Sequence, residues 1–164
     1  NTGNMYVTDT RNDRIQKFSP DGKFITKWGT RGSSDGEFVG PEGIDVNSRG
    51  EIYIADTGNS RVQKFSSDGK FITKWGSKGS GDGQFLLPLG VDLDSHDNVY
   101  VIDKKTTSVQ VFSNNGTFIP PRIRVDIDSE ANLSILEDIE LDGRDDIYLT
   151  DRANHNIKKY NLEE

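Results

Sequence analysis

The sequence contains no cysteine among its 164 residues. This absence excludes disulfide bonds, thiolate metal sites and a cysteine nucleophile, but it does not indicate a compartment, because secreted proteins can also lack disulfides. No stretch approaches the roughly 20 consecutive apolar residues that a membrane-spanning helix needs. Residues 1–5 also lack the basic and apolar regions of a signal peptide. We therefore expect no membrane segment, and the localisation stays open.

The sequence also has few apolar residues and no net positive charge. Only 32% of the residues are hydrophobic, whereas 17 are glycine and 29% are charged. This balance is typical of short strands and many turns and not of long buried helices. The formal net charge of −7 has the wrong sign for a protein that gains affinity by neutralising phosphates. The composition therefore favours one all-β domain over residues 1–164 and disfavours nucleic acid as a partner.

A repeated strand dominates the chain. The pattern Tyr-x-x-Asp recurs four times at offsets of 47, 47 and 48 residues, at Tyr6 to Asp9, Tyr53 to Asp56, Tyr100 to Asp103 and Tyr148 to Asp151. A second strand follows each copy, at residues 14–18, 61–65, 108–112 and 156–160. The pairs Asp21-Gly22, Asp68-Gly69 and Asn115-Gly116 then predict hairpins whose two central residues both have positive φ.

Each complete unit contains four strands, which we name a to d from the inside outwards. The Asp-Gly and Asn-Gly pairs lead into strand d, for example at residues 24–28 and 71–75. Strand a precedes the strand that contains the repeated tyrosine, at residues 41–46, 88–93 and 136–141. Four antiparallel strands on a period of 40 to 50 residues are typical of a β-propeller blade. Since the first unit lacks strand a and the last lacks strand d, the sequence predicts about 3.5 blades with 14 strands. We expect the blades at residues 1–29, 38–76, 85–125 and 135–164, the first and last being partial.

The run from Pro41 to Phe65 resembles the NHL repeat, in which Asn-His-Leu stands where this sequence has Asn59-Ser60-Arg61. The last unit has Asn154-His155-Asn156 at that place, whereas the third departs from the pattern over residues 103–108. The resemblance implies a closed ring, commonly of six blades, which would need about 280 residues at this period. We therefore expect a segment of a larger ring, or a ring completed by another chain.

The two ends of the array predict open strand edges. Residues 5–9 have no strand a beside them, and residues 156–160 have no strand d. Unpaired edges promote association, so we expect them to be covered by further polypeptide or by self-association.

The repeats contain no recognisable catalytic cluster, so we predict no catalytic residues and favour recognition. Variable polar residues lie in the b–c turns and the d–a connections, which we expect to open on one face. Loops on a rigid scaffold are the usual location of recognition sites. We expect this face to bind a protein or other macromolecule. The predicted binding residues are Arg11, Asn12, Asp13, Asn59, Ser60, Lys104, Lys105, Arg152, Asn154 and His155.

An alternative function rests on the strand nearest the axis. Asp45, Asp92 and Glu140 share one repeat position there. They could hold a hard cation such as Ca²⁺, or they could be solvated or hydrogen-bonded between blades. The alternative is therefore a Ca²⁺- or Zn²⁺-dependent lyase or hydrolase acting in the central channel, and no other cofactor is predicted. His96 and His155, the only histidines, are expected on opposite faces and cannot share one ion.

Three further features have structural interpretations. The aspartate and arginine at Asp56 and Arg61 stand at the same repeat positions as Asp9 and Arg14. Their spacing predicts an ion pair across adjacent strands in each of these units. The glycine-rich segments 29–36 and 76–83 lack the Gly-Lys-Ser/Thr ending of a phosphate loop and connect two strands. We expect them to be blade-to-blade connections. The residues expected to anchor and pack between the blades are Phe38, Phe85, Trp28 and Trp75.

Overall fold

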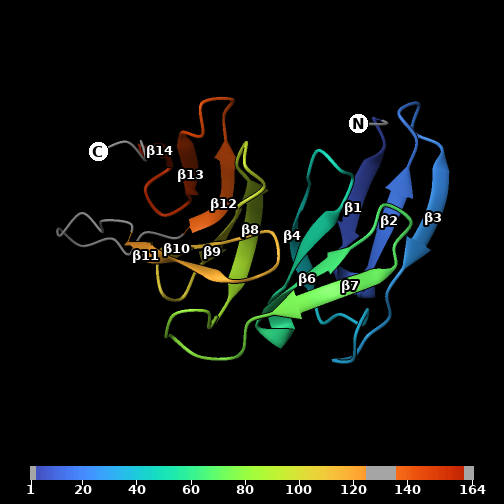
Figure 1. Ribbon diagram of the computed structural model, residues 1–164, viewed down its shortest axis with the longest axis horizontal. Coiled ribbons are helices and arrows are strands. Elements are labelled where there is room, and N and C mark those ends of the chain that lie inside the picture. Colours follow the sequence, from blue (N-terminus) through green and yellow to red (C-terminus); the bar gives the residue numbers. More distant parts are fainter. Residues whose placement is uncertain (1–2, 125–135, 161–164) are drawn as a thin grey trace.

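A computed structural model describes residues 3–124 and 136–160 of the chain. Over these ranges, fourteen strands form four antiparallel sheets of three, four, four and three strands, which confirms the predicted all-β propeller fold (Figure 1). The first sheet contains β1 (Met5–Asp9), β2 (Arg14–Phe18) and β3 (Phe24–Trp28). The second contains β4 (Pro41–Val46), β5 (Ile52–Asp56), β6 (Arg61–Phe65) and β7 (Phe71–Trp75).

The other two sheets follow the same plan. The third contains β8 (Pro88–Leu93), β9 (Val99–Asp103), β10 (Ser108–Phe112) and β11 (Phe118–Arg124). The fourth contains β12 (Leu136–Leu141), β13 (Ile147–Asp151) and β14 (Asn156–Tyr160). Two short 3₁₀ helices, η1 (Thr10–Asn12) and η2 (Thr57–Asn59), occupy b–c turns. The predicted blade limits at residues 1, 125, 135 and 164 lie outside the described residues. No helix in the described part of the chain is long and apolar enough to cross a membrane.

The strand register places the b–c turns and the d–a connections at the same end of every blade, as predicted. In the second sheet Asp56, the last residue of β5, pairs with both Pro41 at the start of β4 and Arg61 at the start of β6. Val62 pairs with Trp75 at the end of β7, so the following connection leaves from that end too. The a–b and c–d hairpins consequently lie at the opposite end.

The c–d hairpins differ from the prediction in one respect. Gly22, Gly69 and Gly116 have φ values of +80°, +82° and +86°, whereas the residue before each glycine does not have positive φ. The expectation of two left-handed central residues is therefore wrong. The amide of Gly22 donates to the carbonyl of Ser19 at 2.9 Å, so the turn takes four residues and only its last is left-handed.

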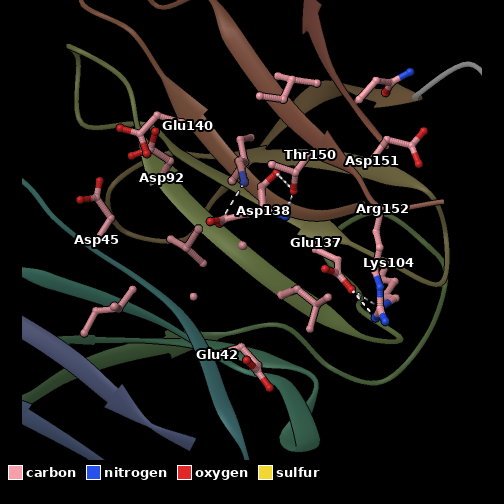
Figure 2. Close-up of a pocket in the computed structure, with 18 of the residues that line it drawn as sticks. Glu42, Asp45, Asp92, Lys104, Glu137, Asp138, Glu140, Thr150, Asp151 and Arg152 are labelled. Carbon is pink, nitrogen blue, oxygen red and sulfur yellow. Dashed lines mark hydrogen bonds and ion pairs between the residues drawn. The ribbon is translucent and has the colours of Figure 1, made fainter. Parts of the chain in front are cut away.

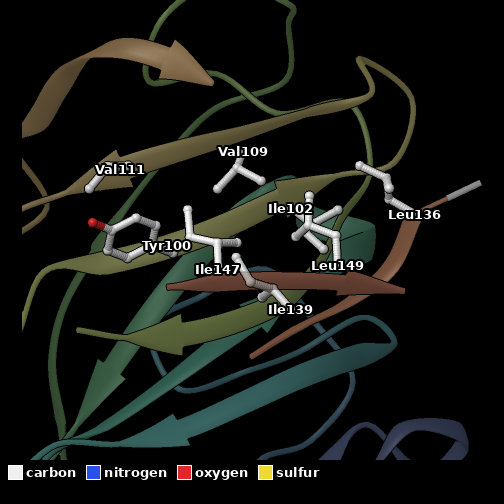
Figure 3. Packing of buried hydrophobic residues seen from close by; sticks show 8 residues of the cluster. All are labelled: Tyr100, Ile102, Val109, Val111, Leu136, Ile139, Ile147 and Leu149. Atoms are coloured by element: carbon white, nitrogen blue, oxygen red, sulfur yellow. The ribbon is translucent and has the colours of Figure 1, made fainter. Parts of the chain in front are cut away.

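Apolar clusters fill the spaces between successive sheets. Between the third and fourth sheets, Tyr100 and Ile102 of β9 face Ile147 and Leu149 of β13 (Figure 3). The equivalent spaces between the earlier sheets are filled in the same way. Burying one such aliphatic side chain contributes about 1.5–3 kcal/mol. The blades therefore stabilise one another mainly through their faces.

The anchoring roles predicted for four aromatic residues are confirmed. Phe38 and Phe85 are fully buried where the chain enters a new blade. Trp28 packs against Phe65 of the second sheet, with ring centroids 6.0 Å apart, and Trp75 packs in the same way against Phe112 of the third sheet at 5.9 Å. The glycine-rich segments thus connect blades, as expected.

The inner strands β4, β8 and β12 lie side by side and form a continuous wall (Figure 1). Glycine makes this close approach possible. A Cβ atom on Gly43 would lie 2.6 Å from the backbone nitrogen of Val91, and one on Gly90 would lie 3.0 Å from that of Ile139. Asp138 takes the same repeat position in β12.

Candidate functional site

A buried carboxylate organises the b–c turn of the second blade. Asp56 is fully buried and accepts hydrogen bonds from Arg61 Nε at 2.7 Å, Asn59 Nδ2 at 2.9 Å and Gln63 Nε2 at 3.0 Å. It also accepts the backbone amide of Val39 at 2.9 Å. The predicted Asp56–Arg61 and Asp9–Arg14 ion pairs both form, each at 2.7 Å. The recurring acid and guanidinium therefore have a structural role.

The same network fixes the loop that arrives from the preceding blade. Arg61 is 6% exposed, and its guanidinium donates to the carbonyl oxygens of Ser33, Ser34 and Glu37 at 2.7–2.9 Å. Gln63 donates to the Glu37 carbonyl at 2.7 Å. The d–a connection is thus tied to the b–c end of the next blade, and this face is built from anchored loops.

The third unit holds its turn without the arginine. Asp103 accepts the backbone amides of Leu86 and Leu87, at 2.6 and 3.1 Å, and that of Lys105 at 3.0 Å. Ser108 stands where the second blade has Arg61. Backbone donors therefore replace the guanidinium, which explains how this blade keeps its geometry despite its altered sequence.

The predicted binding residues differ in how much surface they offer. Asp13 and Ser60 are each 6% exposed and have left-handed backbone conformations, so they form the turns and present little surface to a partner. The side chains of Asn12, Asn59 and Asn154 donate to the aspartate at the end of strand b in their own blades. Arg11, Lys105, Arg152 and His155 are exposed, and Lys104 is partly exposed.

A groove of about 1230 Å³ runs along the inner strands and extends to the b–c turns of the third and fourth blades. It brings together the two predicted sets of residues, because Asp45, Asp92 and Glu140 line it together with Lys104, Arg152 and His155. Figure 2 shows the first three in a row on β4, β8 and β12, with Lys104 and Arg152 gathered around Glu137 elsewhere in the groove. The other predicted binding residues do not line it.

The row of acids connects neighbouring inner strands. Asp45 accepts the backbone amide of Leu93 at 3.1 Å, and Asp92 accepts that of Leu141 in the next blade. Asp92 is 9% exposed, and it shares the backbone amide of Leu93 with the Asp45 carboxyl. Burial, followed by this carboxyl, raises the pKa of Asp92 to about 8. The raised pKa favours the protonated form of Asp92.

Asp45 and Asp92 therefore make hydrogen bonds between blades, one of the alternatives expected for these acids, whereas Glu140 is exposed. The oxygen atoms of Asp92 are used by two backbone amides, those of Leu93 and Leu141. In the described ranges, no group of three or more His, Asp or Glu side chains is placed to hold a metal ion. His96 lies in the β8–β9 hairpin and His155 in the β13–β14 turn, at opposite ends of their blades as predicted.

A second charged cluster lies at the b–c end of the groove. Glu137 accepts from Arg152 Nη1 at 3.1 Å and from Lys104 Nζ at 3.4 Å. The Arg152 guanidinium, together with Lys104, holds the pKa of Glu137 below its usual range, whereas burial raises the pKa of nearby Glu42.

The groove is acidic on balance. Among the described residues that line it, seven carboxyl side chains outnumber the two permanent cations, Lys104 and Arg152. The seven are Glu42, Asp45, Asp92, Glu137, Asp138, Glu140 and Asp151. The groove can therefore attract cationic groups and exclude anionic ones.

Sequence reasoning missed Glu42, Glu137 and Asp138 as members of this groove. All three residues lie near the start of an inner strand. The strand register places this end of each inner strand beside the b–c turns. The substitution of Asp138 for the repeated glycine was a signal that could have drawn attention to the fourth blade.

Comparisons with known proteins establish the fold. The family model described as "NHL repeat" matches residues 38–65. No curated protein matches the chain by sequence. A streptogramin B lyase structure is 18% identical, with a TM-score of 0.62, and the match covers 99% of this chain and 52% of that one.

Two virginiamycin B lyase structures from Staphylococcus aureus are also similar. The first is 14% identical, with a TM-score of 0.70 and coverage of 100% of this chain and 54% of that one. The second, a catalytically inactive variant with quinupristin, is 12% identical, with a TM-score of 0.67 and coverage of 99% and 53%. The chain spans about half the length of these structures. It is therefore a partial β-propeller of four sheets that contains an NHL repeat at residues 38–65.

Proposed function

We propose that the chain is a non-catalytic recognition scaffold that binds a basic segment of a partner protein in the acidic groove. The observation that carries the proposal is the groove itself, in which inner strands and b–c turns of the third and fourth blades present an excess of carboxylates. An extended segment rich in Lys and Arg has the complementary charge, and such complementarity favours specificity and fast association.

The anchoring of the loops supports a binding role. Arg61 and Gln63 fix the d–a connection before the second blade, and Gln110 does the same before the third, with Nε2 donating to the Gln84 carbonyl at 2.7 Å. A surface that is already ordered loses little conformational entropy when a partner binds. Nucleic acid is disfavoured as a partner because both the chain and the groove are acidic.

The test uses a synthetic Lys/Arg-rich peptide and an acidic peptide of equal length, with binding followed by fluorescence anisotropy. We expect the basic peptide alone to bind, with affinity falling steeply as salt increases. Glu42→Lys combined with Glu140→Lys should weaken binding at least about tenfold, because each reversed charge faces the ligand across the groove.

A matched control separates the groove from overall charge. Asp21→Lys combined with Asp68→Lys changes the net charge equally, but at the opposite end of the blades. This variant should bind within about threefold of the parent, a change of less than about 0.7 kcal/mol. Equal weakening by both double variants, or no binding of the basic peptide, would contradict the proposal.

A lyase acting on the channel wall is the second candidate. Two observations favour it: the similarity to lyase structures, and the closeness of the Asp92 carboxyl, whose pKa is raised by burial, to the Asp45 carboxyl, since a raised pKa suits a general acid. A metal-dependent form of this candidate would use Asp45, Asp92 and Glu140 as ligands for Ca²⁺ or Zn²⁺, because an amide that donates to a carboxylate oxygen leaves other lone pairs free.

Conversion of quinupristin, followed by liquid chromatography, tests this second candidate. If the carboxyl pair is the acid and base, the parent chain should convert the compound and Asp92→Asn should not. An unchanged compound after prolonged incubation with folded protein would exclude this substrate.

A further inference from the structure

The two permanent cations of the groove occupy one repeat position, directly after the aspartate that ends strand b. Lys104 stands there in the third blade and Arg152 in the fourth, whereas the first two blades have Thr10 and Thr57. Thr57 Oγ1 donates to the carbonyl of Pro88 on the next inner strand at 2.7 Å. A neutral side chain therefore meets the packing needs of this position, and the change to cations concerns the groove.

Lys104 and Arg152, which we call the cation pair, share a single oxygen atom. Lys104 Nζ and Arg152 Nη1 both donate to Oε1 of Glu137, at 3.4 and 3.1 Å. Among the described residues, Nε and Nη2 of Arg152 and the remaining N–H groups of Lys104 have no acceptor. Two positive charges against one negative charge leave a net positive cluster with free donors, and such donors bind carboxylates well. Lys104 and Glu137 belong to successive blades, so the chain itself builds this junction.

A row of acids lies in a separate part of the groove (Figure 2). Glu140 lies three residues beyond Glu137 on β12, a separation of about 10 Å along an extended strand. Asp45 and Asp92 occupy the same repeat position on β4 and β8, and with Glu140 they form what we call the acid row. The cation pair provides all the permanent positive charge among the described residues that line the groove. The groove is therefore electrically polar, positive beside the b–c turns and negative further along the inner strands.

A peptide that ends in the groove matches this polarity. Its terminal carboxylate lies in line with the extended backbone and so can reach the cation pair. A lysine or arginine three residues before the last residue lies about 10 Å away, which places its side chain at the acid row. An internal Asp or Glu would carry its carboxylate out to one side of the backbone, so a chain terminus is the better match.

We propose that the groove binds the C-terminus of a basic segment, with the terminal carboxylate on the cation pair and a Lys or Arg side chain, about three residues earlier, on the acid row. This inference rests on the proposed function, because it gives a direction and an end to the basic segment that the groove binds. Lys104 and Arg152 are then specificity-determining residues, which select a chain terminus from basic segments in general.

Three peptides of one sequence test the carboxylate, with binding followed by fluorescence anisotropy of an N-terminal label. Each has a lysine three residues before the last residue. The first ends in a free carboxylate, the second in an amide, and the third in an amide with glutamate as its last residue. We expect the free carboxylate to bind at least about tenfold more tightly than the amide, as for the gain of one hydrogen bond between charged groups. Net charge alone predicts the opposite order, because the amide peptide is more positive and the groove is acidic.

Lys104→Thr combined with Arg152→Thr tests the two residues, since threonine stands at this position in the first two blades. In this variant the amide peptide should bind at least as tightly as the free carboxylate. Arg11→Thr combined with Lys105→Thr is the matched control, because both side chains are exposed at b–c turns and do not line the groove. It removes the same charge and should keep the preference for the carboxylate. If the cation pair only neutralised Glu137, the first variant would lower stability without reversing the order of the peptides.

The outcomes separate this inference from the proposed function. If the amide peptide binds as tightly as the free carboxylate, or the glutamate peptide does, the assignment to a C-terminus is wrong although the groove still binds a basic segment. A preference for the free carboxylate that survives Lys104→Thr with Arg152→Thr would also overturn it. If none of the three peptides binds, the proposed function itself fails, and this inference fails with it.

Discussion

At the residue scale, the buried aspartate at the end of strand b stabilises both its own turn and the loop before it. Asp56 neutralises Arg61, which is 6% exposed and holds three carbonyl oxygens of the preceding connection. Asp56→Ala would leave the guanidinium buried without its counter-ion. We expect the free energy of unfolding to fall by about 3–5 kcal/mol, measured by urea denaturation.

The first blade provides the control for this change. Asp9 makes the equivalent contact to Arg14, but the two side chains are 19% and 30% exposed, so solvent can replace the lost partner. Asp9→Ala should therefore destabilise the protein distinctly less than Asp56→Ala. Equal losses would show that burial of the ion pair is not what makes Asp56 important.

At the element scale, the spacing of the inner strands depends on the absence of a side chain. A Cβ on Gly43 would collide with the backbone of β8, which is itself paired to β9 and cannot move away freely. We expect Gly43→Ala to lower the free energy of unfolding by about 1–3 kcal/mol, as for other cases of overpacking. Thermal denaturation followed by circular dichroism provides the measurement.

Gly143 is the matched control for this substitution. A Cβ atom on Gly143 would have open space within 4 Å among the described residues, and this glycine does not have positive φ. Gly143→Ala should be neutral or stabilising by up to about 1 kcal/mol, because alanine reduces the entropy of the unfolded chain. A comparable loss in both variants would count against close strand packing as the cause.

At the scale of the whole molecule, the Asp92 carboxyl joins the third and fourth blades and lies beside Asp45 of the second blade. Asp92 keeps its proton up to about pH 8 in the folded protein, whereas its ordinary pKa is 3.8. Between about pH 4 and pH 8, the folded chain therefore binds a proton that the unfolded chain has released. Stability contributed through this group must fall as the pH rises through that window.

The prediction is a difference between two pH profiles. From pH 5 to pH 8, the free energy of unfolding of the parent should decline more steeply than that of Asp92→Asn, whose side chain does not titrate. Urea denaturation at several pH values measures both slopes. Asp142, whose pKa is lowered chiefly by the backbone amide of Arg144, affects stability below this window. Parallel profiles would mean that Asp92 ionises normally.

Local sequence determined the blades of this protein. The repeated Tyr-x-x-Asp strand, the Asp-Gly hairpins and the 47-residue period specify strand order and register through contacts within one sheet. The same pattern predicted the ion pairs of Asp9 and Asp56 and the packing of Trp28 between blades, because each depends on residues whose relative positions the repeat fixes.

Only the tertiary structure decided which of these residues share a site. Asp45 and Asp92 are 47 positions apart, and the raised pKa of Asp92 reflects its burial and the nearby Asp45 carboxyl, which the close approach of two inner strands at glycine permits. The burial of Asp13, a predicted contact residue, follows from the connection to the next blade, where the backbone amide of Gly40 donates to its carboxylate. The repeat period specifies the strands and contacts within one blade. A groove between blades depends instead on how closely the sheets pack and on which side chains interrupt the repeat, as Asp138 does.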